Sequence, residues 1–246
     1  MARRVTVVRT ARELLEVDDP GWPDVERAVA ESPRDVRVLP IEPGAGADVV
    51  SRLQVSARST LGALASACGG LVVDHGWLRI LGGGHDGLPS LATATRLDPP
   101  GPDAKPPPAL VVGYDVLGGR FAVDAGGLGV QEGEVCYLGP DALSWVGLGA
   151  GHGAFVHWAL GGEGLDDFYA SLRWPGWQQR VGVLALDRGL AAYPPPFTEE
   201  GQDLSAASLR EVPFAELLTW YDEVREQIAD LPEGEAFELR PTEDPP

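Results

Sequence analysis

The chain of 246 residues and 26.0 kDa has room for one sizeable domain or two small ones, and its 44% hydrophobic and 23% charged residues are typical of globular proteins. Its 19 Lys and Arg residues against 37 Asp and Glu residues give a formal net charge of −18, which argues against a surface for nucleic acid. No apolar run approaches the roughly 20 residues of a membrane span, so we expect no membrane association.

Helix and strand signals alternate along the first hundred residues. Thr10 and Glu13 have the spacing of a capping box, and a proline suits the first turn of a second helix over 23–30. Further signals predict a strand at 36–39, a helix at 61–68 that ends on a left-handed Gly69, and two strands, 71–74 and 77–81, joined at His75-Gly76.

Short strands and then helices are predicted beyond residue 108. The strands span 109–113, 120–123 and 134–138, and the helices span 155–160, 165–172, 178–186 and 213–231. These elements favour an α+β class with a small antiparallel sheet flanked by helices. The residues on the apolar side of each element are expected to share one core: Trp77, Ile80, Leu81, Phe121, Val123, Phe155 and Trp158.

One domain is expected over residues 1–233. The proline-rich segment 98–108 suits a loop inside that domain, because neither flank is large enough to close a core alone. The last 48 residues hold 14 acids and 3 bases, so they carry −11 of the −18. We expect the acidic tail 234–246 to fray, since like charges repel.

The chain contains two cysteines, Cys68 and Cys136, outside any C-x-x-C or multi-cysteine pattern. The first residues carry positive charge but lack the apolar core of a signal peptide. Both observations favour reduced thiols in a cytoplasmic protein.

A glycine pattern, Gly82-x-Gly84-x-x-Gly87, follows a predicted strand as in dinucleotide sites. Pro89 interrupts the helix that such a site needs, so the pattern favours a glycine turn and no cofactor. No nucleophile elbow of the form G-x-S-x-G is present, and Asp166-Asp167 suits the start of a helix better than acid–base chemistry.

Two short histidine motifs flank the strand 77–81. Asp74-His75 and His85-Asp86 form a metal or small-molecule site if the turns bring them together; otherwise they are turn residues that bind backbone. His152 and His157 are five residues apart, which is off the helical spacing of metal ligands. We therefore expect no transition-metal site among the four histidines.

Several long stretches resemble a known family: Leu53–Leu64, Gly69–Gly82, Asp115–Asp124, Tyr137–Trp145, Phe168–Trp174 and Tyr193–Glu216. Together, over roughly residues 10–220, they resemble the bacterial family designated domain of unknown function 2625. That family has no established activity, so the resemblance implies kinship without naming chemistry. The segment 98–108 departs from the pattern, where a shorter loop is expected.

The order of elements over residues 55–165 is also similar to that of the SUKH superfamily. A helix before Gly69-Gly70, the strands after it, the motif Asp115–Phe121 and a helix with Phe155 and Trp158 carry this resemblance. It implies an α+β scaffold with variable surfaces that binds proteins, as immunity proteins bind toxins, and no shared catalytic site.

These observations predict a non-enzymatic, immunity-like binding module for a basic protein partner or toxin, since a negative surface attracts a positive one. The alternative is a small-molecule-binding protein or enzyme that uses the glycine-rich region Asp74–Asp86. The candidate binding residues are Asp74, His75, His85, Asp86, Asp115, Glu223 and Glu226.

Overall fold

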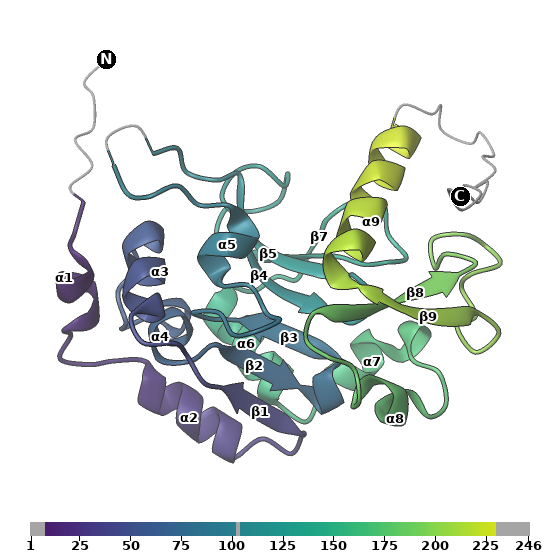
Figure 1. Ribbon diagram of the computed structural model, residues 1–246, viewed down its shortest axis with the longest axis horizontal. Helices are drawn as coiled ribbons and strands as arrows, with labels where there is room; N and C mark the ends of the chain where they lie inside the picture. Colours follow the sequence, from purple (N-terminus) through teal and green to yellow (C-terminus); the bar gives the residue numbers. More distant parts are fainter. Residues whose placement is uncertain (1–7, 102–103, 230–246) are drawn as a thin grey trace.

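The computed structural model describes residues 8–101 and 104–229, and its centre is a seven-stranded sheet (Figure 1). Strand order follows the chain and each neighbouring pair is antiparallel. The strands are β1 (Val36–Leu39), β2 (Gly70–Val73), β3 (Leu78–Leu81), β4 (Ala109–Asp115), β5 (Arg120–Asp124), β6 (Val135–Leu138) and β7 (Val146–Gly147). The α+β class is confirmed, with a larger sheet than expected.

Both faces of the sheet centre are covered, because every residue of β2, β3 and β6 is buried. This explains the continuous apolar runs in these strands, where a half-exposed strand would alternate. Arg79 is the exception in β3 and is only 2% exposed. Its guanidinium donates hydrogen bonds of 2.8 Å to the carbonyls of Leu186 and Arg188, which fixes the start of a second, two-stranded sheet.

The N-terminal helices gather beside β1 and β2 (Figure 1). The capping box at Thr10 and Glu13 is confirmed at the start of the first helix, and the Ser59 side chain caps the fourth. The helices are α1 (Ala11–Leu15), α2 (Trp22–Ala30), α3 (Ala45–Leu53), α4 (Thr60–Ala67) and, before β4, α5 (Leu91–Thr95).

The C-terminal half adds short helices and a hairpin with a long helix. In order these are α6 (His152–Leu160), α7 (Leu165–Phe168), the 3₁₀ turn η2 (Ala170–Leu172), α8 (Trp177–Val181), β8 (Arg188–Tyr193), β9 (Ser208–Pro213) and α9 (Phe214–Ala229). Figure 1 shows α9 beside β8 and β9, at the opposite end of the molecule from α2. Its inner side buries Phe214, Leu217, Tyr221 and Val224, whose spacing of three and four residues places them on one face of the helix.

Some sequence expectations need correction. Gly69 does not end α4 in the left-handed conformation; Cys68 is already extended, and the Gly69 amide bonds the Leu39 carbonyl at the end of β1. The helix expected over 178–186 ends at Val181, because a turn at Gly182 follows. Strand β7, helices α3 and α5 and the β8–β9 hairpin are absent from the prediction. The tail 234–246 lies outside the described residues.

The predicted core is confirmed. Trp77, Ile80, Leu81, Phe121 and Phe155 are buried in one cluster, against which Val123 and Trp158 pack partly buried. Among the described residues of segment 98–108 there is no helix or strand. No described helix has both the length and the apolar character to cross a membrane.

Replacing Phe121 with Ala should lower the free energy of unfolding by about 3–5 kcal/mol, because the cavity left by a buried ring does not close fully. The ring is 0% exposed, and its centroid lies 4.6 Å from that of Tyr137 and 4.9 Å from that of Phe155. Denaturant unfolding measures the loss. Val183→Ala, at a side chain 84% exposed, is the control and should change stability by less than about 0.5 kcal/mol. Equal effects of the two variants would contradict this packing.

Candidate functional site

The turn between β2 and β3, η1 (Asp74–Gly76), has an unusual backbone. Asp74, His75 and Gly76 all have positive φ, at 56°, 59° and 96°. Asp and His tolerate this left-handed region better than most side chains, and glycine accepts it freely. The Asp-His-Gly sequence therefore suits this left-handed turn, in which Asp74 is 7% exposed.

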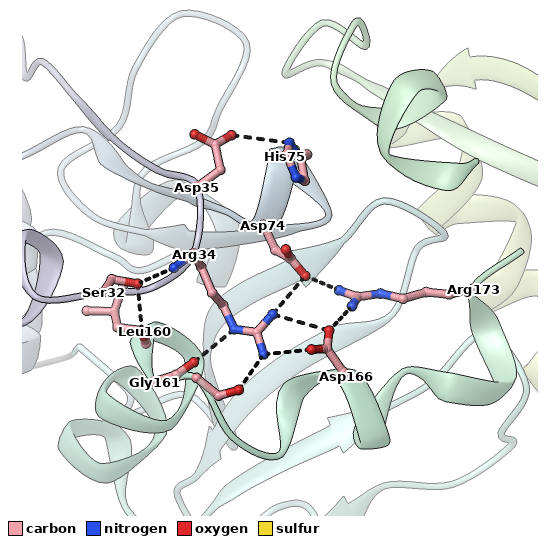
Figure 2. Close-up of polar contacts among 10 residues, drawn as sticks. Ser32, Arg34, Asp35, Asp74, His75, Leu160, Gly161, Asp166 and Arg173 are labelled. Carbon is pink, nitrogen blue, oxygen red and sulfur yellow. Dashed lines mark hydrogen bonds and ion pairs between the residues drawn. The ribbon is translucent and has the colours of Figure 1, made fainter. Parts of the chain in front are cut away.

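Asp74 belongs to a cluster of two carboxylates and two guanidinium groups (Figure 2). Its Oδ2 accepts hydrogen bonds from Arg34 at 3.3 Å and from Arg173 at 2.5 Å. Asp166, in the first turn of α7, binds the same two arginines at 3.2 and 2.6 Å. The side chains of Arg34, Asp74 and Arg173 are 7%, 10% and 8% exposed, whereas that of Asp166 is 68% exposed. The four charges balance within one group.

Aromatic rings surround Arg173. Its guanidinium carbon lies 4.9 Å from the Trp77 ring centroid, 5.2 Å from that of Tyr169 and 4.1 Å from that of Trp177. Such contacts stabilise a cation that has lost water. Arg34 also donates to the carbonyls of Gly161 and Gly162, so the cluster joins four separate chain segments.

The chemistry of this cluster is structural. The Asp74 carboxylate is paired with two cations, and the hydrogen bond from Arg34, with the nearby positive charges, lowers the pKa of Asp166. This lowered pKa makes the Asp166 carboxylate a poor proton acceptor. Asp74 is a turn residue, as expected if the two histidine motifs do not form a shared site. Its side chain, however, binds guanidinium groups rather than backbone.

Asp74→Asn should reduce the free energy of unfolding by about 3–5 kcal/mol, because it leaves two buried arginines short of a counter-charge. Asparagine accepts the same backbone conformation, so the turn itself is retained. Asp166→Asn, at an exposed carboxylate in the same cluster, should cost less than half as much. Urea unfolding of both variants measures the difference, and equal losses would contradict the dominance of Asp74.

The remaining histidine motif lies apart from Asp74 and His75. His75 is near Asp35, with 3.6 Å between Nδ1 and Oδ2, at the turn end of β3. His85 follows the other end of β3 and contacts the Pro40 carbonyl through Nδ1 at 3.0 Å; Asp86 is exposed. A four-residue strand separates the motifs by roughly 13 Å. The structure therefore places the two motifs at opposite ends of β3.

The other candidate groups lie in the following surroundings. Throughout residues 8–101 and 104–229, no three His, Cys, Asp or Glu side chains are placed to hold a metal ion. Gly82 packs against the end of α4, where an added Cβ would come within 2.6 Å of the Cys68 carbonyl oxygen, so the glycine pattern forms a tight turn. Cys68 and Cys136 are free and buried, and burial raises the pKa of Cys68 to about 12.

Asp115 is fully buried at the end of β4. Its Oδ1 accepts hydrogen bonds of 2.9 Å from the amides of Leu117 and Gly119, and its Oδ2 accepts one of 2.5 Å from the Tyr137 hydroxyl. A Cβ on Gly119 would lie 2.0 Å from Asp115 Oδ2, so this position requires glycine. Burial raises the pKa of Asp115 to about 6, although these three hydrogen bonds favour the ionised form.

This raised pKa makes stability fall as pH rises from about 4 to 6, because the folded chain holds a proton that the unfolded chain has released. Relative to Asp115→Asn, the native protein should therefore gain on the order of 2–3 kcal/mol between pH 7 and pH 4. Denaturant unfolding at both pH values measures the change. A constant difference between the two proteins would contradict it.

His152 provides the opposite case. It is 9% exposed at the start of α6, neither ring nitrogen has a hydrogen-bond partner among the described residues, and burial lowers its pKa to about 4. Between pH 6.5 and pH 4 the unfolded chain binds a proton at His152 that the folded chain does not bind. The folded protein therefore loses stability as the pH falls through this range. The variant His152→Leu should therefore become more stable relative to the native protein on acidification, the reverse of Asp115→Asn.

Glu223 and Glu226 lie on the outer side of α9, where they are exposed. The inner side is fixed to the protein body: Arg120 bonds the Leu218 carbonyl and Asp222, and Arg225 bonds the Gly139 carbonyl. Along the outer side runs an open groove of about 280 Å³ lined by Ala215, Glu216, Thr219, Trp220 and Glu223. Within the described part of the chain, Glu216, Glu223 and Glu226 form no ion pair.

Sequence reasoning missed the cluster partners Arg34 and Arg173 and the exposed Trp220. The two arginines carry no local signal, because each meets Asp74 from a distant segment. Trp220 does have a local sequence signal. Glu216, Trp220 and Glu223 are spaced i, i+4 and i+7, which places them on one side of a helix.

A comparison with family models matches residues 11–217 to the family described as "Protein of unknown function DUF2625". Among curated proteins, the uncharacterized protein YbfG of Escherichia coli (strain K12) is 33% identical over 207 residues, which are 83% of this chain and 94% of the relative. An uncharacterized protein of Haemophilus influenzae (strain ATCC 51907 / DSM 11121 / KW20 / Rd) is 28% identical over 178 residues, or 72% and 78% of the two chains. No solved structure matches the chain. Trp220 and Glu223 follow the range that the family model matches.

Proposed function

The chain belongs to the DUF2625 family, whose function is unknown, and we propose that it is a non-enzymatic binding module that recognises a basic protein partner through the outer side of α9. The observation that carries this proposal is the groove on that side, which combines an exposed indole with carboxylates that form no ion pair with any described residue. Aromatic anchors supply much of the affinity in protein interfaces, and complementary charge sets the rate and choice of partner.

Contrast within α9 supports this assignment. Asp222 faces Arg120 and Arg225, at 2.7 and 4.0 Å, so its charge is neutralised by the chain itself. Glu216, Glu223 and Glu226 are exposed on the same helix and have no such partner among the described residues. The helix thus uses one acid for its own attachment and presents three to solvent. A positively charged protein surface is the complement of that arrangement.

Rigidity of the helix also favours a binding role. Four apolar side chains of α9 are buried, and arginines from β5 and from α9 itself bond its backbone and that of the loop after β6. A side chain presented on a fixed element loses less freedom on binding than one on a mobile loop. The proposal includes an immunity-like role, in which the partner is a basic toxin, and a cytoplasmic location, which the two free cysteines favour.

Reversing Glu223 and Glu226 to Lys should slow association with the partner about five- to tenfold at low salt, with a smaller effect at high salt, because steering is screened. The partner is first captured from an extract of cells that naturally make the chain, then purified. Association rate is measured against ionic strength.

The matched control is the reversal of Glu26 and Glu31, two exposed glutamates on and just after α2, which changes net charge by the same four units. Removal of residues 234–246 should also leave association little changed. If both double reversals slow association equally, the effect belongs to total charge and α9 is not the docking side. A rate independent of salt would contradict the electrostatic basis of the proposal.

A further inference from the structure

The groove on α9 has the composition of a site for one cationic side chain. Trp220 lies at its middle, 37% exposed, with Glu216 one turn before it and Glu223 one turn after it. Side chains at these spacings are about 5–6 Å apart at Cβ. All the residues that line the groove belong to α9, so it is shallow and open to solvent. A small-molecule site buries most of its ligand, so this groove suits a side chain presented by a partner better than a cofactor.

Two aromatic side chains of the protein hold the Trp220 indole in place. Its ring stacks on Phe197, with centroids 6.0 Å apart and an interplanar angle of 30°. Tyr221 packs against it edge-on at 5.0 Å. Phe197 belongs to the loop between β8 and β9, so two elements support the indole. An aromatic surface held in this way is ready for a ligand without rearrangement.

From these contacts we propose that the groove binds an arginine side chain of the basic partner, stacked on Trp220 and bonded by Glu216 and Glu223. The inference rests on the proposed function and names the group recognised. A guanidinium fits better than an ammonium, because it is planar, stacks on rings and can bond two carboxylates at once. The chain itself uses this chemistry at Arg173, where a guanidinium contacts three aromatic rings and two carboxylates.

The occupant comes from outside the described chain. Neither groove carboxylate forms an ion pair there, although Asp222, one residue before Glu223, forms two. A cation supplied by a binding partner would therefore complement the charge of these two carboxylates. A second copy of this chain carries arginines too, and the experiment is designed to recognise that case.

The experiment is a titration of the ¹⁵N-labelled full chain followed by NMR at the indole N–H of Trp220, which Trp220→Phe assigns. The probes are the peptides acetyl-Gly-Arg-Gly-amide, its lysine version and its citrulline version, which keeps the shape of arginine without the charge. We expect saturable shifts of the Trp220 signal with the arginine peptide, binding about tenfold weaker for citrulline, and intermediate binding for lysine.

Variants then test the named groups. The double variant E216Q/E223Q should weaken the arginine peptide about fivefold or more with an unchanged melting temperature. E26Q/E31Q on α2 is the matched control and should leave binding unchanged. Trp220→Ala removes the stacking surface and should abolish saturable binding, as read from neighbouring amide signals. Equal binding of arginine and citrulline, or an unmoved Trp220 signal, would overturn the inference.

The outcomes separate the inference from the proposed function. If reversal of Glu223 and Glu226 slows the partner while arginine does not reach Trp220, the binding function stands and the arginine site is wrong. If arginine binds at Trp220 while the reversal of Glu223 and Glu226 leaves the association rate of the partner unchanged, the cation site stands and the docking side is wrong. If the Trp220 signal shifts on dilution of the protein alone, the occupant is a second copy and the assignment to a foreign partner fails.

Discussion

Sharing of the Asp74 carboxylate between two nearly buried arginines is the interaction on which the chain's long-range organisation depends. Each of these ions alone would be costly to remove from water, and only their mutual contacts make the burial tolerable. The partners come from the loop before β1, the β2–β3 turn, α7 and the segment after η2 (Figure 2). The Arg173–Asp74 and Arg34–Asp166 contacts therefore tie the N-terminal part of the chain to the C-terminal part, in addition to the pairs that each part forms within itself.

Arginine fulfils the same joining role elsewhere in the molecule. Arg79 bonds two carbonyls at the start of β8, and Arg225 bonds the Gly139 carbonyl beyond β6. A planar guanidinium can bond two oxygens of another segment at once, which the compact ammonium of lysine cannot do as well. The chain contains a single lysine, Lys105, among its 19 basic residues. Several of these arginines bond backbone carbonyls of distant segments, a role that suits the planar guanidinium.

Sequence patterns predicted several elements that have clear local signals, and they missed α3 and the β8–β9 hairpin, whose signals are weak. The strand at 36–39 and the helix capped by Ser59 have clear boundaries, and the apolar stripe of α9 repeats over four turns. Helix α3 begins at a left-handed Gly44 with no side-chain cap and contains Gly46, so its start signals were weak. Strands β8 and β9 are joined by a 14-residue loop, Pro194–Ala207, in place of a two-residue turn, which removed the usual hairpin signature.

The candidate site could also be predicted only in part, because one member has a local signal and its partners do not. Asp74 could be singled out because it stands in a turn beside a histidine, but its partners lie 40 and 99 residues away, and no local pattern joins them. The family comparison identifies kin over residues 11–217, and the α+β class agrees with the element order. The relation to the SUKH superfamily and the identity of the partner remain predictions.

Burial of the two thiols has a consequence for how the protein can be observed. Cys68 is 1% exposed at the end of α4, and its thiolate form is suppressed at neutral pH because burial raises its pKa to about 12. An alkylating reagent reacts with a thiolate that it can reach. In the folded chain Cys68 is both inaccessible and protonated, so it is protected from the reagent. Modification at Cys68 then proceeds only through openings that separate α4 from the sheet. The native sequence thus carries its own chemical reporter of local unfolding, and no label has to be introduced.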